Sequence, residues 1–145
     1  MTHLAFARDS LALLCGLQGL GTVAVDLNRT HATNPLWTAH ARFHVVWQTA
    51  NMTLLALLEV ALVLFHGPFQ EQRFYLAAVM AAVPMAGFFA PLIGRGIYGG
   101  ALSDPNGIPP ANVRLFGRTF KVDLNTAVII MALLTLVAII AIYRL

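Results

Sequence analysis

Between Asp123 and Arg144 the chain reads Leu124-Asn-Thr-Ala-Val-Ile-Ile-Met-Ala-Leu-Leu-Thr-Leu-Val-Ala-Ile-Ile-Ala-Ile-Tyr143, which is 20 residues without a charge. A helix needs about 20 apolar residues to cross the hydrocarbon core of a bilayer. Over the whole chain of 145 residues, 59% are hydrophobic and 10% are charged, against roughly 45–50% and 25% in soluble domains. These observations exclude an ordinary soluble domain and predict an integral membrane protein.

Three further apolar blocks precede this one. They are 16 uncharged residues between Asp9 and Asp26, 21 between Arg73 and Arg95, and a block from Phe43 to Gln70 that contains a single acid, Glu59. We therefore predict an all-α fold, a four-helix bundle in the membrane that forms one domain over residues 1–145. The helices are expected near 9–27, 40–66, 70–98 and 122–144, with a tight turn at His66-Gly67-Pro68.

A secretory signal is the alternative interpretation of the first block, because Arg8 precedes a short apolar stretch. No small-residue cleavage site follows Cys15-Gly16, which disfavours this alternative. The single cysteine cannot form an internal disulfide, so the sequence does not reveal the redox compartment.

The basic residues near the helix ends predict the orientation, because positively charged flanks stay on the cytoplasmic side. Six lie in or flank the two long loops, namely Arg29, Arg42, Arg95, Arg114, Arg118 and Lys121, and three lie on the opposite side, namely Arg8, Arg73 and Arg144. Both termini are therefore expected on the non-cytoplasmic side of a multi-pass protein of the cell membrane. The formal charge of +3 reflects this topology, and no basic run with interleaved aromatic residues predicts nucleic-acid binding.

A polar stripe runs along the second predicted helix. At about 100° per residue, its members share a sector of about 100°; they are His40, His44, Gln48, Asn51 and Glu59. Polar groups at membrane depth usually face the bundle or a wet cavity, so we expect the stripe to face inward and to line a functional cavity. The alternative is that Gln48 and Asn51 only hold helices together by hydrogen bonds. Glu59 would be protonated or paired with a residue such as Gln18.

Two histidines four residues apart on a helix can bind one metal ion, so His40 and His44 are candidate metal ligands. A di-iron bundle would need Glu-x-x-His pairs, and the remaining histidines are His3, His31 and His66. A haem with a single axial histidine stays open as an interpretation. For Trp37 and Arg42, an interfacial belt that anchors the helix end is the preferred interpretation.

The third predicted helix contains prolines and glycines at Pro84, Gly87, Pro91, Gly94 and Gly96. It should kink or break toward its cytoplasmic end, and the stretch 91–100 would wall the same pocket as the polar stripe. Tyr98 would point its phenol into that pocket. The alternative is that these residues only permit close helix packing.

Polar residues are expected to form a mouth at the same end of the bundle, because Asp26 ends the first helix and Asp123 and Asn125 begin the fourth. The long third loop contains the turn signal Ser103-Asp-Pro-Asn-Gly. Its apolar residues, Ile108, Leu115 and Phe116, indicate order, and we predict a lid over the pocket.

Local motifs resemble those of the styrene oxide isomerases, four-helix membrane enzymes that rearrange epoxides to carbonyl compounds. The motifs are Trp37-Thr-Ala-His40, Gly96-Ile-Tyr98, the turn Ser103-Asp-Pro-Asn-Gly-Ile, and Phe116-Gly117. The resemblance covers about a third of the chain. It implies a haem b whose ferric iron acts as a Lewis acid, ligated by His40 or His44. It also implies that Asn51 and Tyr98 position the epoxide and that the protein forms homo-oligomers, in that family trimers.

The function expected from these features is a membrane enzyme that isomerises a small lipophilic substrate taken from the lipid bilayer. The catalytic candidates are Tyr98, Asn51 and Glu59. A first alternative is a non-enzymatic membrane subunit or small transporter with Glu59 as a buried coupling charge. A second is an acid/base isomerase without a cofactor, in which Glu59 and His44 move protons. These two residues are 15 positions apart, roughly 22 Å along a straight helix, which argues against direct cooperation.

Overall fold

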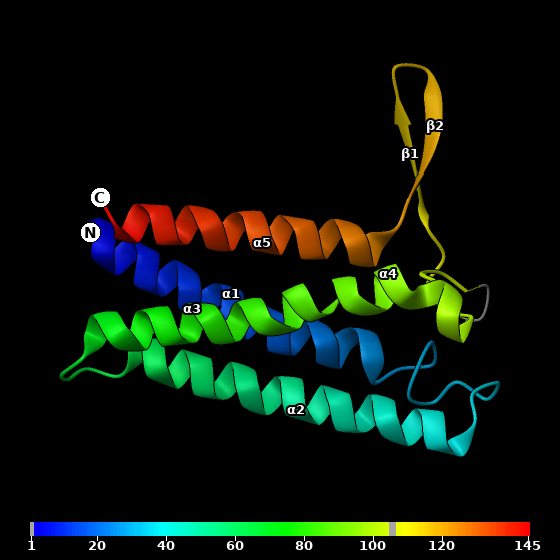
Figure 1. Ribbon diagram of the computed structural model, residues 1–145, viewed down its shortest axis with the longest axis horizontal. Coiled ribbons are helices and arrows are strands. Elements are labelled where there is room, and N and C mark those ends of the chain that lie inside the picture. Colours follow the sequence, from blue (N-terminus) through cyan, green and yellow to red (C-terminus); the bar gives the residue numbers. More distant parts are fainter. Residues whose placement is uncertain (1, 105–106) are drawn as a thin grey trace.

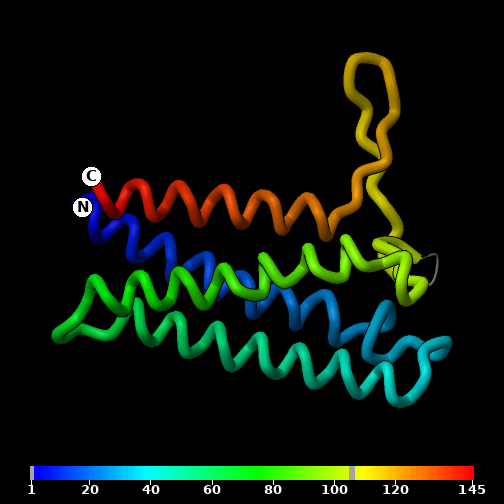
Figure 2. The backbone as a smooth tube through the Cα atoms, viewed as in Figure 1, coloured from blue at the N-terminus to red at the C-terminus, as the bar shows by residue number. Residues whose placement is uncertain are grey.

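The computed structural model of the protein describes residues 2–104 and 107–145, and 69% of these residues are helical. The elements in chain order are α1 (His3–Asp26), α2 (Ala39–Leu64), α3 (Gln70–Gly87), α4 (Phe89–Tyr98), β1 (Ala111–Leu115), β2 (Arg118–Val122) and α5 (Leu124–Tyr143). The helices run up and down in one elongated bundle, and both termini lie at the same end (Figure 1). The path of the backbone, with long connections at the other end, is easiest to follow in Figure 2.

The helices begin at residues that cap them. The side chains of Thr2, Thr38 and Asp123 accept hydrogen bonds from backbone N–H groups in the first turns of α1, α2 and α5, and Thr and Asp are favoured at this position. The first helix starts at His3, six residues before its predicted boundary at residue 9, because the prediction took the charged residues Arg8 and Asp9 as its limit. The Arg8 guanidinium instead donates a hydrogen bond of 2.8 Å to the backbone oxygen of Val63.

Among the described residues, three helical segments are long and apolar enough to cross a membrane: 39–64, 70–98 and 124–143. In α5 only 11% of the apolar window is buried within the chain, so most of its apolar surface faces outward. The first helix is of comparable length, with 24 residues, but it is not among these three.

The third segment is divided at Phe88 into α3 and α4. Pro91 has no N–H, so the carbonyl of Gly87 has no partner four residues ahead, and α3 ends at Gly87. The backbone at Phe88 keeps helical angles, φ −58° and ψ −33°, and its N–H donates to the Pro84 oxygen at 3.2 Å. A kink of the axis at this position stays a prediction.

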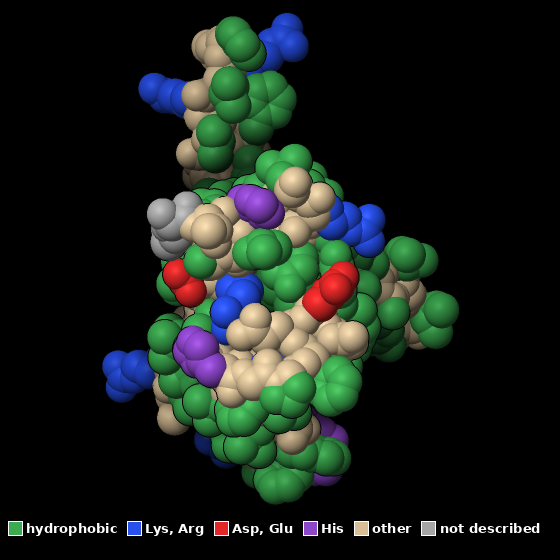
Figure 3. Space-filling view, turned by 90° about the vertical axis from the view of Figure 1, so that its left-hand side faces the viewer, with side chains coloured by type: hydrophobic (Ala, Val, Ile, Leu, Met, Phe, Trp, Pro, Cys, Tyr) green, Lys and Arg blue, Asp and Glu red, His purple; other side chains and the backbone are tan. Residues whose placement is uncertain are grey.

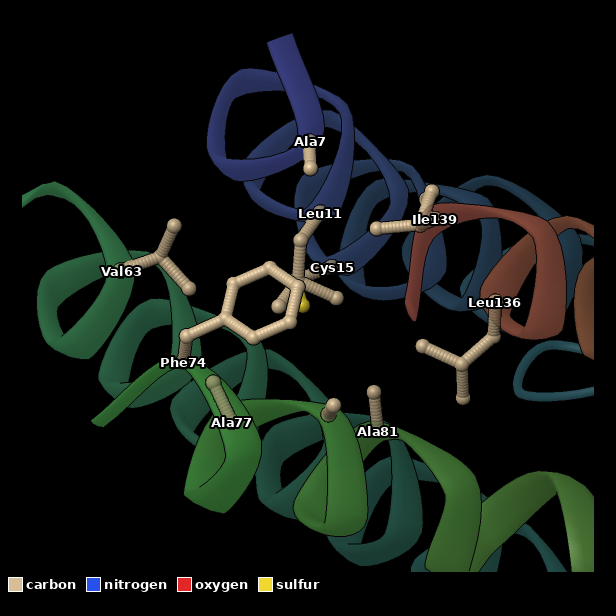
Figure 4. Close-up of a cluster of buried hydrophobic side chains, with 10 residues drawn as sticks. Ala7, Leu11, Cys15, Val63, Phe74, Ala77, Ala81, Leu136 and Ile139 are labelled. Carbon is tan, nitrogen blue, oxygen red and sulfur yellow. The ribbon is translucent and has the colours of Figure 1, made fainter. Parts of the chain in front are cut away.

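The core lies toward the end of the bundle that carries both termini. Figure 4 shows buried side chains from four helices pointing toward one another, and they comprise Ala7, Leu11, Cys15, Val63, Phe74, Ala77, Ala78, Ala81, Leu136 and Ile139. On α1 the buried residues recur every fourth position and end at Gly19. A Cβ on Gly19 would lie 2.7 Å from the Cβ of Ala56, so glycine permits the close approach of α1 and α2.

The third loop contains a β-hairpin that the sequence analysis did not predict. Phe116 and Gly117 join its strands with positive φ angles of 50° and 75°, which are the signs of a type I′ turn. The hairpin stands away from the bundle (Figure 1), and all residues from 112 to 121 are exposed. The predicted lid is therefore wrong for this segment, because a hairpin that leaves the bundle covers no pocket in the same chain. The all-α prediction is correct for the bundle, but it did not include the β1–β2 hairpin.

The turn signal before the hairpin is only partly described. Gly107 N–H donates to the Asp104 oxygen at 2.9 Å. The two central positions, 105 and 106, lie outside the described residues.

Candidate functional site

The two histidines of α2 contact each other on the helix surface. Their Nε2 atoms are 3.1 Å apart and their ring centroids 4.5 Å apart, with the rings nearly perpendicular. One Nε2–H therefore donates to the lone pair of the other ring. Both side chains are exposed, so this imidazole pair, formed by His40 and His44, is open to a ligand outside the chain.

Aromatic side chains extend this surface along α2. The indole of Trp47 lies 5.8 Å from the His44 ring at an angle of 32°, and the Phe43 ring lies 6.1 Å from it. Both aromatic residues are more than half exposed. The first turns of α2 thus present two imidazole nitrogens beside two exposed aromatic rings.

The polar stripe does not face inward as predicted. His40, His44, Gln48 and Asn51 are exposed, and only Glu59 is buried. The bundle contacts α2 through Thr49, Ala56 and Val63, which at about 100° per residue lie roughly 140–180° around the helix from His40. Glu59, at the edge of the predicted sector, is the member that reaches this side.

Glu59 lies in the interior with an exposed fraction of 0%. Within the described part of the chain, neither carboxyl oxygen accepts a hydrogen bond and the buried Oε1 of Gln18 has no hydrogen-bond partner. The pair of Glu59 with Gln18 that the sequence suggested is therefore not formed. The thiol of Cys15 on α1 lies close enough to the Glu59 carboxyl for the two groups to interact electrostatically. The sequence analysis did not anticipate that Cys15 lies next to Glu59. Its place in the four-residue repeat 7, 11, 15, 19 does predict a buried position.

Tyr98 lies away from the polar stripe of α2. It lines a cavity of about 180 Å³ between α4 and the start of α5. Its hydroxyl donates to the Pro91 oxygen at 2.8 Å, and Arg95 and Asn125 lie at the same cavity. No residue of α2 lines it. The prediction of one pocket shared by the polar stripe and the stretch 91–100 is therefore wrong for a single chain.

The residues of the predicted polar mouth do not form one cluster, because Asp26 lies at the contact of α1 with α2 while Asp123 and Asn125 lie at the start of α5. The Thr49 hydroxyl donates to Asp26 Oδ2 at 3.4 Å at the contact of α1 with α2. Asp123 caps α5, because its Oδ1 accepts from Thr126 N at 2.8 Å. Asn125 belongs to the Tyr98 cavity. Each carboxylate thus has a local structural partner.

A second cavity, of about 640 Å³, lies at the end of the bundle that carries the termini, and the sequence analysis did not anticipate it. Its lining residues are Leu4, Glu71, Tyr75, Tyr143 and Arg144. The Arg144 Nε donates to the Tyr75 hydroxyl at 3.3 Å. Tyr75, near the start of the third predicted helix, and Tyr143, near the end of the fourth, were the features of the sequence from which this cavity could have been predicted. Figure 3, which views the bundle from this end, shows acidic, basic and histidine side chains gathered here.

Comparison with known protein families, curated proteins and solved structures gives no match to this chain. The site is therefore interpreted from its own geometry.

The imidazole pair presents two nitrogen ligands, fewer than the three or four protein ligands of a typical zinc site. Within residues 2–104 and 107–145 no three His, Cys, Asp or Glu side chains gather as a metal site. A porphyrin supplies four ligands itself and needs only one axial histidine. His40 or His44 can provide that nitrogen once the bond between the rings opens, and Phe43 and Trp47 offer apolar contacts to a flat macrocycle.

Proposed function

We propose that the chain is an integral membrane protein in which α1 makes a fourth crossing. With 24 residues and a rise of 1.5 Å per residue, α1 is about 36 Å long, more than the roughly 30 Å of the hydrocarbon core. It packs against α2 and α5, two of the helices that are long and apolar enough to span. The excess of basic residues in the long loops supports a multi-pass protein of the cell membrane with both termini on the non-cytoplasmic side.

The exposed polar face of α2 supports a homo-oligomer. Asn51 lies 12 residues after the start of α2, about 18 Å along a helix of about 39 Å, and is thus close to the middle of the bilayer. Neither Asn51 nor Gln48 makes a side-chain hydrogen bond within the described part of the chain. An unpaired amide costs roughly 4–8 kcal/mol in alkane. A second copy of the chain that covers this face would supply partners, and the resemblance noted above suggests a trimer.

At this face the protein acts as an isomerase of small lipophilic molecules, with the conversion of an epoxide to a carbonyl compound as the leading reaction. The single observation that carries this proposal is the exposed imidazole pair on a membrane helix. A bound ferric haem would supply a Lewis acid, with His40 or His44 as the axial ligand. The other histidine would then be free to accept or donate a hydrogen bond close by.

The remaining steps are bond changes within the substrate and hydrogen bonds from two side chains. Polarisation of the epoxide oxygen opens one C–O bond, and a hydride migrates within the substrate to give the carbonyl. Asn51 and Tyr98 would donate hydrogen bonds to the oxygen. Because Tyr98 lies at the cavity between α4 and α5, away from the α2 face of its own chain, it would come from a neighbouring subunit.

The test is the visible absorption spectrum of protein purified from haem-replete cells, for the wild type and for His40→Ala and His44→Ala. His66→Ala is the matched control, because His66 is an exposed histidine at the opposite end of α2. We expect a Soret band that one of the two α2 variants removes and that the control retains. A colourless protein, or a band that both variants keep, would refute the haem proposal.

A second candidate function rests on Glu59, whose carboxyl is fully buried and unpaired. Such a group supports a membrane subunit or small transporter in which Glu59 is a buried coupling charge. This candidate predicts ligand binding or uptake that depends on pH in the wild type and loses that dependence in Glu59→Gln. The cofactor-free acid/base isomerase has less support, because His44 is exposed while Glu59 is buried in the bundle.

A further inference from the structure

The hairpin β1–β2 separates its side chains into two faces. Residues that are directly opposite in an antiparallel pair point to the same side, and the register pairs Ala111 with Val122, Val113 with Phe120, and Leu115 with Arg118. Five of these six residues are apolar. The other face carries Asn112 opposite Lys121 and Arg114 opposite Thr119. The hairpin is thus amphipathic, with an apolar face and a polar, basic face.

The apolar face is uncovered in the chain. Leu115 and Phe120 are each 50% exposed, and Phe116 at the turn is 97% exposed. A two-stranded hairpin is marginally stable in water by itself. Some other surface is therefore expected to cover it.

The position of the hairpin indicates which surface this is. The hairpin joins α5 directly at Asp123 and lies crosswise to the long axis of the bundle (Figure 1). If α5 runs along the membrane normal, the hairpin lies along the membrane surface. Figure 3 looks along the bundle from the end with the termini, and the hairpin face turned to that end carries mainly hydrophobic side chains with Lys or Arg at its edges. That face is directed toward the bilayer.

The charge of the hairpin indicates the kind of lipid. Residues 111–122 contain Arg114, Arg118 and Lys121 and no acidic residue. Each Lys or Arg held close to an anionic membrane surface strengthens binding by about fivefold. Three such residues beside an apolar surface resemble the composition of segments that lie in the interface of anionic membranes.

We propose that the β1–β2 hairpin is an interfacial anchor that inserts its apolar face into the lipid surface and binds anionic headgroups through its basic side chains. The proposal rests on the membrane embedding described above, but it is independent of haem and of catalysis. It assigns a role to the third loop in place of the predicted lid.

The test uses the full chain in nanodiscs with an environment-sensitive fluorophore on single cysteines, in a Cys15→Ala background. Val113→Cys and Asn112→Cys are neighbours in sequence on opposite faces of the hairpin, so they form a matched pair. Nanodiscs of phosphatidylcholine alone and with 30% phosphatidylglycerol are compared, with and without lipids brominated in the acyl chains. Met131→Cys, on an exposed position of α5, reports whether the bundle is embedded.

We expect the Val113 probe to be shielded from water and quenched by brominated lipid, more strongly with phosphatidylglycerol, and the Asn112 probe to stay in water. In the anionic nanodiscs, Arg118→Gln should lower the ratio of inserted to free hairpin by about fivefold, because Arg118 pairs with Leu115 on the apolar face. Equal signals at both positions, or a shielded Val113 probe that no brominated lipid quenches, would overturn the anchor; the second result would indicate cover by another protein copy. If the Met131 probe is also unquenched, the membrane embedding itself fails, whereas quenching at Met131 alone refutes only the anchor.

Discussion

The buried carboxyl of Glu59 gives a prediction whose sign differs from that of most core substitutions. An unsatisfied buried polar group costs about 1–3 kcal/mol, and among residues 2–104 and 107–145 neither oxygen of this carboxyl has a hydrogen-bond partner. Methionine is of similar size and flexible enough to fill the same space. We therefore expect Glu59→Met to stabilise the protein by about 1–3 kcal/mol, whereas Glu59→Gln should gain little because the amide remains unpaired.

The assay is thermal unfolding in detergent, followed by circular dichroism. For a chain of this size 1 kcal/mol corresponds to about 4 °C in Tm, so Glu59→Met should unfold about 4–12 °C above the wild type. Leu58→Met is the matched control on the same helix, because Leu58 is 52% exposed, and its Tm should stay close to that of the wild type. A Glu59→Met variant that unfolds below the wild type, with an unchanged control, would show that the carboxyl has a stabilising partner and refute the reasoning. A gain in stability together with a loss of function would indicate that Glu59 is kept for function.

Two further predictions concern contacts of α1, measured in the same unfolding assay. Gly19→Ala would place a Cβ 2.7 Å from that of Ala56 and should destabilise the bundle by about 1–3 kcal/mol. Gly16→Ala meets nothing within 4 Å and should instead stabilise by up to about 1 kcal/mol through helix propensity; equal effects at the two glycines would contradict the close packing of α1 on α2. Arg8→Met removes the charged hydrogen bond to the Val63 oxygen and should lower stability by about 1–2 kcal/mol, so an unchanged Tm would show that this bond contributes nothing in detergent.

The sequence by itself determined the helical segments. A helix satisfies its own backbone hydrogen bonds, so an apolar block of sufficient length between charges is enough to predict one. For this reason the predicted segments 40–66, 70–98 and 122–144 differ by at most two residues at either end from the structure, apart from the division at Phe88. The first helix was placed less well, because Arg8 and Asp9 were taken as its limit while tertiary contact with α2 extends it to His3.

The β1–β2 hairpin could not be predicted from the sequence, for a different reason. Its turn, Phe116-Gly117, places a bulky residue at positive φ, where Asn or Asp is usual. The signal for a hairpin is therefore weak, and the apolar residues of this loop were taken as evidence for a lid. Only the tertiary structure reveals that the segment leaves the bundle.

The side of α2 that the bundle covers could not be obtained from its own residues. Periodicity placed His40, His44, Asn51 and Glu59 on one broad sector, but burial depends on which helices pack against it. The close approach of α1 through Gly19 and the core near Cys15 bury Glu59 and leave the imidazole pair outside. A helix sequence thus determines which residues share a face, because the rise and turn of the backbone are local. Contacts with residues far along the chain decide which face is covered, and on α2 they leave the imidazole pair uncovered.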